Sequence, residues 1–175
     1  MSVQELRNNL GEYAKDIKLN LGNVLSEEGA PGLTQSQIYQ IALGSAYATK
    51  NPTVINAIKA EVEGKLSEAE TNAVKAAATI MAMNNIYYRF IHLTSDKDFG
   101  TMPANLRMNV MANPGIPKVD FELISLAVSA IEGCGMCMDA HVREVVKGGV
   151  SKQGTQSAIR IAATINAAYQ AVIIG

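Results

Sequence analysis

Hydrophobic residues recur every three or four positions along most of this chain, which is the spacing of one face of an α-helix. The first such stretch runs from Ser2 to about Ser26, and its apolar face consists of Val3, Leu6, Leu10, Tyr13, Ile17 and Leu21. No segment shows the alternation or the β-branched runs that are typical of strands. The pattern therefore predicts an all-α fold.

Side chains that accept hydrogen bonds from a first helical turn mark where further helices begin. Thr34 with Gln37 forms a capping box, and Ser67 with Glu70 forms a second one. Asn51 precedes a proline at the first helical position. The helices predicted from these signals and from the apolar spacing cover residues 35–49, 52–64, 68–93, 119–131, 134–148 and 151–173.

Residues 94–118 interrupt the helical pattern. They contain two glycines and three prolines and form the longest irregular stretch, with one short turn expected near residues 105–111. The run 74–82 can be laid over 125–133, which indicates a degenerate internal repeat of a helical pair. All 175 residues are expected to form one domain, because the chain is long enough for one sizeable core and short for two.

Composition and charge describe a protein without bulk attraction to nucleic acid or to membranes. The net charge is −1, and hydrophobic residues make up 48% of the chain. The first seven residues carry charge and lack the apolar core of a signal peptide. No uninterrupted apolar run approaches the ~18 residues that a membrane-spanning helix needs. These features predict a soluble, cytoplasmic protein.

The chemistry of the chain is concentrated in one short motif. Cys134 and Cys137 are the only cysteines, and His141 follows one helical turn later. In a reducing compartment such a pair is typical of catalysis or metal binding. A helix start at Cys134 favours the thiolate, whereas Glu132 and Asp139 oppose it through their negative charge. Because Cys137 and His141 are four residues apart, they share a helix face, and the imidazole can take the thiol proton directly or through one water.

Glu122 adds a carboxylate to this group. It lies in the otherwise apolar helix 119–131, and a tight turn after that helix would make the pair 119–148 antiparallel, so that Glu122 faces His141. A buried carboxylate is costly unless it is paired, and here it would stabilise a protonated imidazole. Glu122, His141 and Cys137 are then expected to form an acid–base–nucleophile relay.

A metal-binding module is the alternative interpretation. Cys134, Cys137 and His141 offer three zinc ligands, and His92 or Glu122 could supply a fourth. The soft thioethers of Met136 and Met138, at the motif, would also suit Cu(I). Structural zinc sites usually use paired knuckles, and the chain has one. Outside this alternative, His92 is interpreted as structural, and core filling is expected of most of Met81, Met83, Met108, Met111, Met136 and Met138.

Three segments and the motif match a known pattern. The segments are EYAKDIKLNL at 12–21, MNNIYYR at 83–89 and LRMNVMANPGIPK at 106–118, the last of which leads into Phe121-Glu122-Leu123 and the Cys-x-x-Cys-x-x-x-His motif. Together they resemble the alkyl hydroperoxide reductase D (AhpD) family, a branch of the carboxymuconolactone decarboxylase-like superfamily. The glutamate, both cysteines and the histidine fall at the spacing of that family. The resemblance covers nearly the whole chain and is weakest over residues 22–35.

The resemblance implies an all-α fold with an internal helical repeat, usually assembled as a homotrimer. It implies an antioxidant disulfide reductase that regenerates the peroxiredoxin AhpC and has alkyl hydroperoxidase activity of its own, with no tightly bound cofactor. The electrons would come from dihydrolipoamide on a lipoyl-bearing acyltransferase and from lipoamide dehydrogenase. The superfamily name raises decarboxylation of a lactone acid as a third activity, and the redox cysteines argue against it.

The same resemblance implies roles for the residues of the motif. Glu122 and His141 look like the proton relay. Cys137 looks like the sulfur that attacks peroxide or the AhpC disulfide, and Cys134 looks like the resolving thiol and proton donor. This chain departs from some relatives at Met136, where they have a histidine, so a proton transfer through that position is not carried over.

Overall fold

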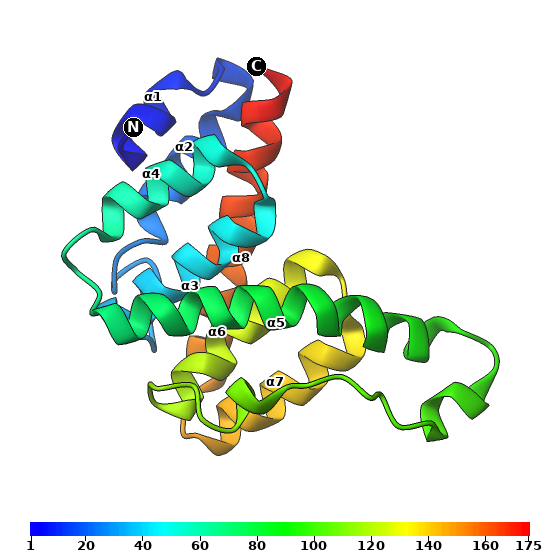
Figure 1. Ribbon diagram of the computed structural model, residues 1–175. Coiled ribbons are helices and arrows are strands. Elements are labelled where there is room, and N and C mark those ends of the chain that lie inside the picture. Colours follow the sequence, from blue (N-terminus) through cyan, green and yellow to red (C-terminus); the bar gives the residue numbers. More distant parts are fainter.

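The computed structural model describes residues 1–175 and contains helices joined by turns and loops, which confirms the all-α prediction. The α-helices are α1 (Val3–Asn9), α2 (Lys15–Asn23), α3 (Gln35–Thr49), α4 (Pro52–Val62), α5 (Glu68–Leu93), α6 (Lys118–Glu132), α7 (Gly135–Lys147) and α8 (Lys152–Ile174). Three short 3-10 helices complete the set, namely η1 (Glu12–Ala14), η2 (Lys97–Thr101) and η3 (Asn109–Met111). Helix α5 crosses the molecule, and both termini lie at the same end (Figure 1).

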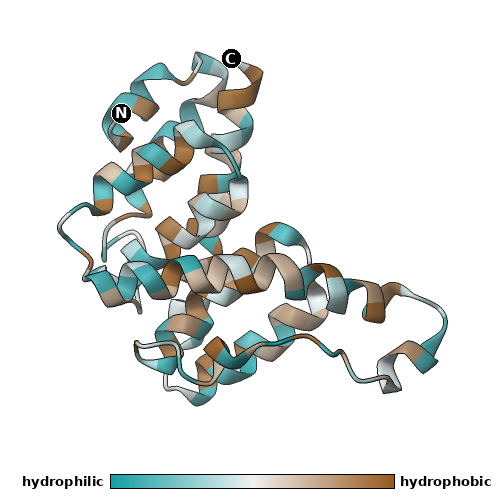
Figure 2. Cartoon of the chain, viewed as in Figure 1, coloured by the Kyte–Doolittle hydropathy of each residue, from teal (hydrophilic) through white to brown (hydrophobic).

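Helix α6 forms the centre of the structure. The residues from Phe121 to Ser129 are all buried, and α6 packs against α3, α5, α7 and α8. Gly44 makes the close approach of α3 possible, because a Cβ atom there would lie 2.6 Å from Cγ2 of Ile124. The surrounding helices turn many of their apolar positions inward and their polar positions outward (Figure 2). The helix that carries Glu122 is therefore held by four neighbours.

The predicted helix starts are confirmed by the hydrogen bonds of their caps. Oγ1 of Thr34 accepts from the Gln37 amide, and the Gln37 side chain accepts in return from the Thr34 amide. Ser67 and Glu70 form the same reciprocal pair at the start of α5. Oδ1 of Asn51 accepts from two amides in the first turn of α4. Local side-chain chemistry thus determines where these helices begin.

The N-terminal segment differs from the single helical stretch expected over residues 2–26. Leu10 and Gly11 are extended, with ψ angles of 143° and 162°, and they separate α1 from η1 and α2. Glycine inside a helix is less stable than alanine by about 1 kcal/mol, so a break here costs little. Leu10 is buried as predicted, but Tyr13 is 57% exposed, and its hydroxyl donates to the carbonyl of Ala171 in α8. The expectation of a continuous apolar face that includes Tyr13 was wrong.

The prediction of a long connection at 94–118 is confirmed, although α6 already begins at Lys118. The connection contains η3 within the predicted turn and also η2, which was not predicted. It extends away from the end of α5 and returns beside α7 (Figure 1). Its returning part packs against the core through Val110, Met111 and Ile116, which are partly buried. This segment therefore forms one wall of the region around α7.

Helix α8 is long and apolar enough to cross a membrane by length and composition alone. In the structure it packs against α2, α3 and α6, and Ile161 and Ile165 are completely buried there. A helix with its apolar face in contact with protein is typical of a core element. Packing inside the protein therefore accounts for the apolar composition of α8.

Glu70 links α3 to α5 and makes the stability of this contact dependent on pH. Its carboxylate accepts from the Ser36 hydroxyl, from the Ser67 amide and from the Gln40 side chain, and these bonds lower the pKa of Glu70 from its ordinary value of 4.5. Because the folded state has the lower pKa, the contribution is complete above pH 4.5 and disappears as the pH falls through the lowered value.

We expect Glu70→Gln to reduce the free energy of unfolding at pH 7 by about 1–2 kcal/mol, because charge-assisted hydrogen bonds become neutral ones. The difference from the parent should shrink as the pH falls below 4.5. Urea unfolding at pH 7 and in acid measures both effects. Glu68→Gln, at an exposed position in the same helical turn, is the matched control. An equal difference at both pH values would contradict the prediction.

Candidate functional site

The two cysteines lie at the turn between α6 and α7. Gly133, with φ of +73°, ends α6 in the left-handed conformation that glycine adopts readily. Cys134 is the N-cap of α7, and its Sγ accepts from the amide of Cys137 at 3.3 Å. The two sulfurs are joined in a disulfide. The predicted motif is thus assembled at a helix start in its oxidised form.

Of the two negative charges expected beside the motif, one is paired with a cation and the other is exposed to solvent. The Glu132 carboxylate lies 3.0 Å from Nζ of Lys50, and the Glu132 carbonyl accepts from the guanidinium of Arg89 at 2.5 Å. These contacts also attach the turn to α3 and α5. Asp139 is exposed to solvent, where its charge is strongly screened. The charges near the motif therefore oppose a thiolate less than the sequence indicated.

Glu122 and His141 meet between α6 and α7, as the antiparallel arrangement predicted. Both residues are 4% exposed, and Oε2 of Glu122 lies 2.6 Å from Nδ1 of His141. With the carboxylate as the acceptor of this bond, its hydrogen lies on Nδ1. The second ring nitrogen, Nε2, lies 3.2 Å from Sδ of Met81. The pair fixes the ring orientation and leaves Nε2 directed at a thioether.

An apolar cavity of about 290 Å³ opens beside this pair. Its lining comes from α5, from the segment around η3 and from α7, and consists of Met81, Asn84, Tyr88, Met108, Met111, Met136, Cys137, Ala140 and His141. Both Cys137 and His141 thus face the same space, on one side of α7. A small molecule with an apolar part has room to reach the sulfur and the imidazole together.

The cavity distinguishes the two cysteines. Cys137 lines it and is 6% exposed, whereas Cys134 is completely buried and does not line it. Cys134 instead holds the N-cap position, where the amide of Cys137 and the helix dipole favour a negative sulfur. One sulfur is therefore placed to meet a reactant, and the other is placed to be stabilised as a thiolate.

Sequence reasoning missed most of the cavity wall. Met81 is part of the core as expected, but it also lines the cavity together with Met108, Met111 and Met136. Asn84 was not singled out by any chemical motif. A signal was present, since the segments 83–89 and 106–118 carry part of the family resemblance although they contain no nucleophile.

The other candidate groups lie outside this cavity. His92 is exposed, and its ring lies 3.6 Å from where a Cβ atom on Gly135 would stand, so it does not belong to the core. No group of three or more His, Cys, Asp or Glu side chains is arranged to hold a metal ion. The zinc interpretation stays a prediction.

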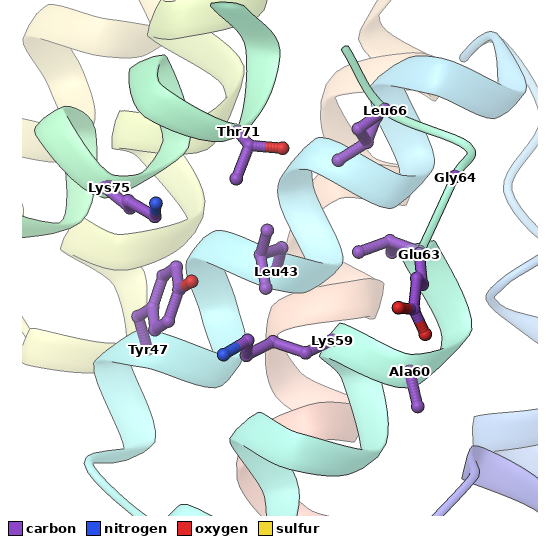
Figure 3. A pocket seen from close by; sticks show the side chains of 10 residues that line it. Leu43, Tyr47, Lys59, Ala60, Glu63, Gly64, Leu66, Thr71 and Lys75 are labelled. Carbon is purple, nitrogen blue, oxygen red and sulfur yellow. The ribbon is translucent and has the colours of Figure 1, made fainter. Parts of the chain in front are cut away.

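A second cavity, of about 360 Å³, lies between α3, α4 and the start of α5. Figure 3 shows the side chains of Tyr47, Lys59 and Lys75 around the apolar side chain of Leu43. Burial raises the pKa of the Tyr47 hydroxyl, so this phenol is neutral at physiological pH. This cavity contains neither cysteine nor histidine, whereas Cys137 and His141 line the cavity at α7.

Comparison with known proteins agrees with this geometry. Residues 97–173, which contain Glu122 and the whole motif, match the carboxymuconolactone decarboxylase family. The alkyl hydroperoxide reductase AhpD of Coxiella burnetii (strain RSA 493 / Nine Mile phase I) is 54% identical over 172 residues, which cover 98% of this chain and 97% of that protein. AhpD of Rhodopseudomonas palustris (strain BisA53) is 50% identical over 175 residues, covering 100% and 95%. AhpD of Maricaulis maris (strain MCS10) is 52% identical over 167 residues, covering 95% of each. The chain therefore belongs to the AhpD family of alkyl hydroperoxide reductases.

Proposed function

We propose that this protein is a thiol–disulfide oxidoreductase that reduces alkyl hydroperoxides and the disulfide of a peroxiredoxin through Cys134 and Cys137. The observation that carries the proposal is the position of Cys137 in an apolar cavity beside His141, whose ring is held by the buried Glu122. Thiol, imidazole and carboxylate in that order are the parts of an activated nucleophile. The names of the relatives support the reduction of alkyl hydroperoxides.

Reduction of a hydroperoxide begins with the dithiol form. His141 accepts the Cys137 proton at Nε2, directly or through one water, and Glu122, bound at Nδ1, stabilises the imidazolium that results. The thiolate attacks the terminal oxygen of the hydroperoxide, the O–O bond breaks, and the alcohol leaves with one proton. Cys137 is now a sulfenic acid. The Cys134 sulfur displaces its hydroxyl as water, and the disulfide forms.

The disulfide is reset by a dithiol, for which we propose dihydrolipoamide. One of its thiolates attacks Cys137, the sulfur that lines the cavity, and Cys134 leaves as a thiolate stabilised at the start of α7. The second thiol of the donor closes its own disulfide, so two electrons and two protons pass to the protein. A peroxiredoxin disulfide is reduced in the opposite sense, by attack of the Cys137 thiolate.

The partners proposed with this chemistry are AhpC, a lipoyl-bearing acyltransferase and lipoamide dehydrogenase, in the cytoplasm. Apolar side chains on α7 support docking beside the motif, because Met136, Val142 and Val146 are each 36–45% exposed. We also propose a homotrimer. Exposed apolar side chains at the C-terminal half of α5 and around η2 support it, because a surface of this kind suits contact with another copy; these residues are Ile86, Phe90, Leu93, Phe99 and Met102.

A coupled assay tests the proposal. The purified protein is mixed with dihydrolipoamide, lipoamide dehydrogenase and NADH and challenged with tert-butyl hydroperoxide, with and without AhpC. We expect NADH consumption that rises sharply when AhpC is present. Consumption independent of AhpC would identify a peroxidase that does not regenerate AhpC. Absence of consumption in both mixtures would contradict the proposal, and elemental analysis for zinc would then test the metal-binding alternative.

A further inference from the structure

The polar groups at the cavity beside α7 are few. Of the residues that line it, Cys137 is the reactive sulfur, and His141 binds Glu122 through Nδ1 and serves as the proposed proton acceptor through Nε2. Four of the lining side chains are thioethers, which are weak hydrogen-bond acceptors, namely Met81, Met108, Met111 and Met136. Among the other lining residues, Tyr88 carries a phenol, and Asn84 contributes the only carboxamide, from the middle of α5.

The carboxamide of Asn84 has almost no hydrogen-bond partner in the protein. The residue is 4% exposed, Oδ1 has no partner, and Nδ2 donates at 3.6 Å to Sδ of Met111. A buried amide in this state destabilises the fold, because it has lost its hydrogen bonds to water without full replacement. The adjacent Asn85 also has one unpartnered group, Nδ2, but its Oδ1 accepts from the Ser129 hydroxyl and ties α5 to α6, and Asn85 does not line the cavity. The one hydrogen bond of the Asn84 amide is the weak bond to Met111, whose thioether lines the same cavity.

We propose that Asn84 is a substrate-binding residue whose amide donates a hydrogen bond to the inner, alkyl-bearing oxygen of the hydroperoxide. The inference rests on the hydroperoxide reductase function proposed above. Nδ2 of Asn84 now donates to the Met111 thioether, which is a weak acceptor. An oxygen of the hydroperoxide in its place would satisfy this N–H group. The alkyl group then lies against the apolar walls, where flexible methionine side chains adapt to its shape.

The role follows from where charge develops. When the Cys137 thiolate attacks the terminal oxygen, electrons move onto the inner oxygen as the O–O bond breaks, and this oxygen leaves as an alkoxide before it is protonated. A fixed N–H donor in a site of low polarity stabilises such a charge most strongly in the transition state. A carboxamide serves this purpose without repelling the thiolate, as a carboxylate would.

Asn84→Leu tests the inference, because leucine has a similar volume and removes the amide. We expect the reduced variant to react with cumene hydroperoxide in a single turnover about 10–100-fold more slowly at saturation, with a smaller change in the half-saturating concentration. Its reaction with 2,2′-dithiodipyridine should stay within about twofold of the parent, because the thiopyridone that leaves needs no donor. Loss of free thiol measures both rates, and Asn72→Leu, on an exposed position of α5, is the matched control.

Thermal unfolding separates a binding role from a structural one. We expect Asn84→Leu to unfold at the same temperature as the parent or higher, since an unpartnered buried amide is removed. If leucine prevents folding, Asn84→Met, whose side chain adapts to irregular space, decides the question by the same measurements. An unchanged rate with cumene hydroperoxide in a folded variant would overturn the inference, and so would equal losses with both reagents. Failure of the parent to reduce cumene hydroperoxide would instead overturn the proposed function itself.

Discussion

Cys137→Ser is expected to abolish the reduction of both hydroperoxides and disulfides, with a loss of about 10³-fold or more. A serine hydroxyl is not ionised near neutral pH, and it forms neither a sulfenic acid nor a disulfide. Cys137 is also the cysteine that faces the cavity, whereas Cys134 is completely buried. The coupled NADH assay with tert-butyl hydroperoxide, and a stoichiometric assay with the AhpC disulfide, measure the two activities.

Cys134→Ser is the matched control for this prediction. It retains the Cys137 nucleophile, so it should still consume one equivalent of hydroperoxide. Cys137 then remains as a sulfenic acid, because no second thiol resolves it, and turnover stops. Trapping with dimedone and mass spectrometry would locate the adduct on Cys137. An adduct on Cys134 in Cys137→Ser, formed at the rate of the parent reaction, would reverse the roles proposed for the two sulfurs.

Glu122→Gln is expected to slow both reactions by about 10–100-fold near neutral pH while the fold stays intact. The glutamine oxygen can still accept from Nδ1 of His141, so the ring keeps its orientation. It lacks the charge that stabilises the imidazolium formed when His141 takes the thiol proton. The deficit should shrink as the pH rises, because the thiolate then forms without the imidazole. Rates measured across neutral pH, with circular dichroism as the check on folding, give the result.

Glu144→Gln is the control for the loss of one carboxylate from this region. Glu144 lies on α7 in a solvent-exposed pair with Lys118, and such pairs contribute about 0–1 kcal/mol to stability. Its activity should match the parent. If Glu122→Gln and the parent were equally active across neutral pH, the proton relay would be excluded, and the buried Glu122 would serve only the packing of α6 against α7.

The fold was predictable where the signal is local. Thr34, Asn51 and Ser67 carry their caps within three or four residues, so the helices they begin could be recognised without tertiary information. The break at Leu10 and Gly11 could not, because the apolar spacing continues through it. After this break, Tyr13 donates a hydrogen bond to the carbonyl of Ala171 in α8. Ala171 is far along the chain, so local preference does not determine this contact.

The site divides in the same way. The sequence by itself determined the spacing of Cys134, Cys137 and His141, because residues three or four apart on a helix must share a face. It also determined the antiparallel return that brings Glu122 to His141, because the turn between α6 and α7 is short.

Tertiary structure alone decided which sulfur meets the cavity and what surrounds it. Cys134 and Cys137 are equivalent as a motif, and packing of α5 and the segment around η3 against α7 left only Cys137 beside the opening. Asn84 and Met111 reach the site from helices and loops that are distant in sequence, where each residue alone resembles core filling. A cavity arises from surfaces that meet only when the chain folds, so no local pattern of residues specifies it.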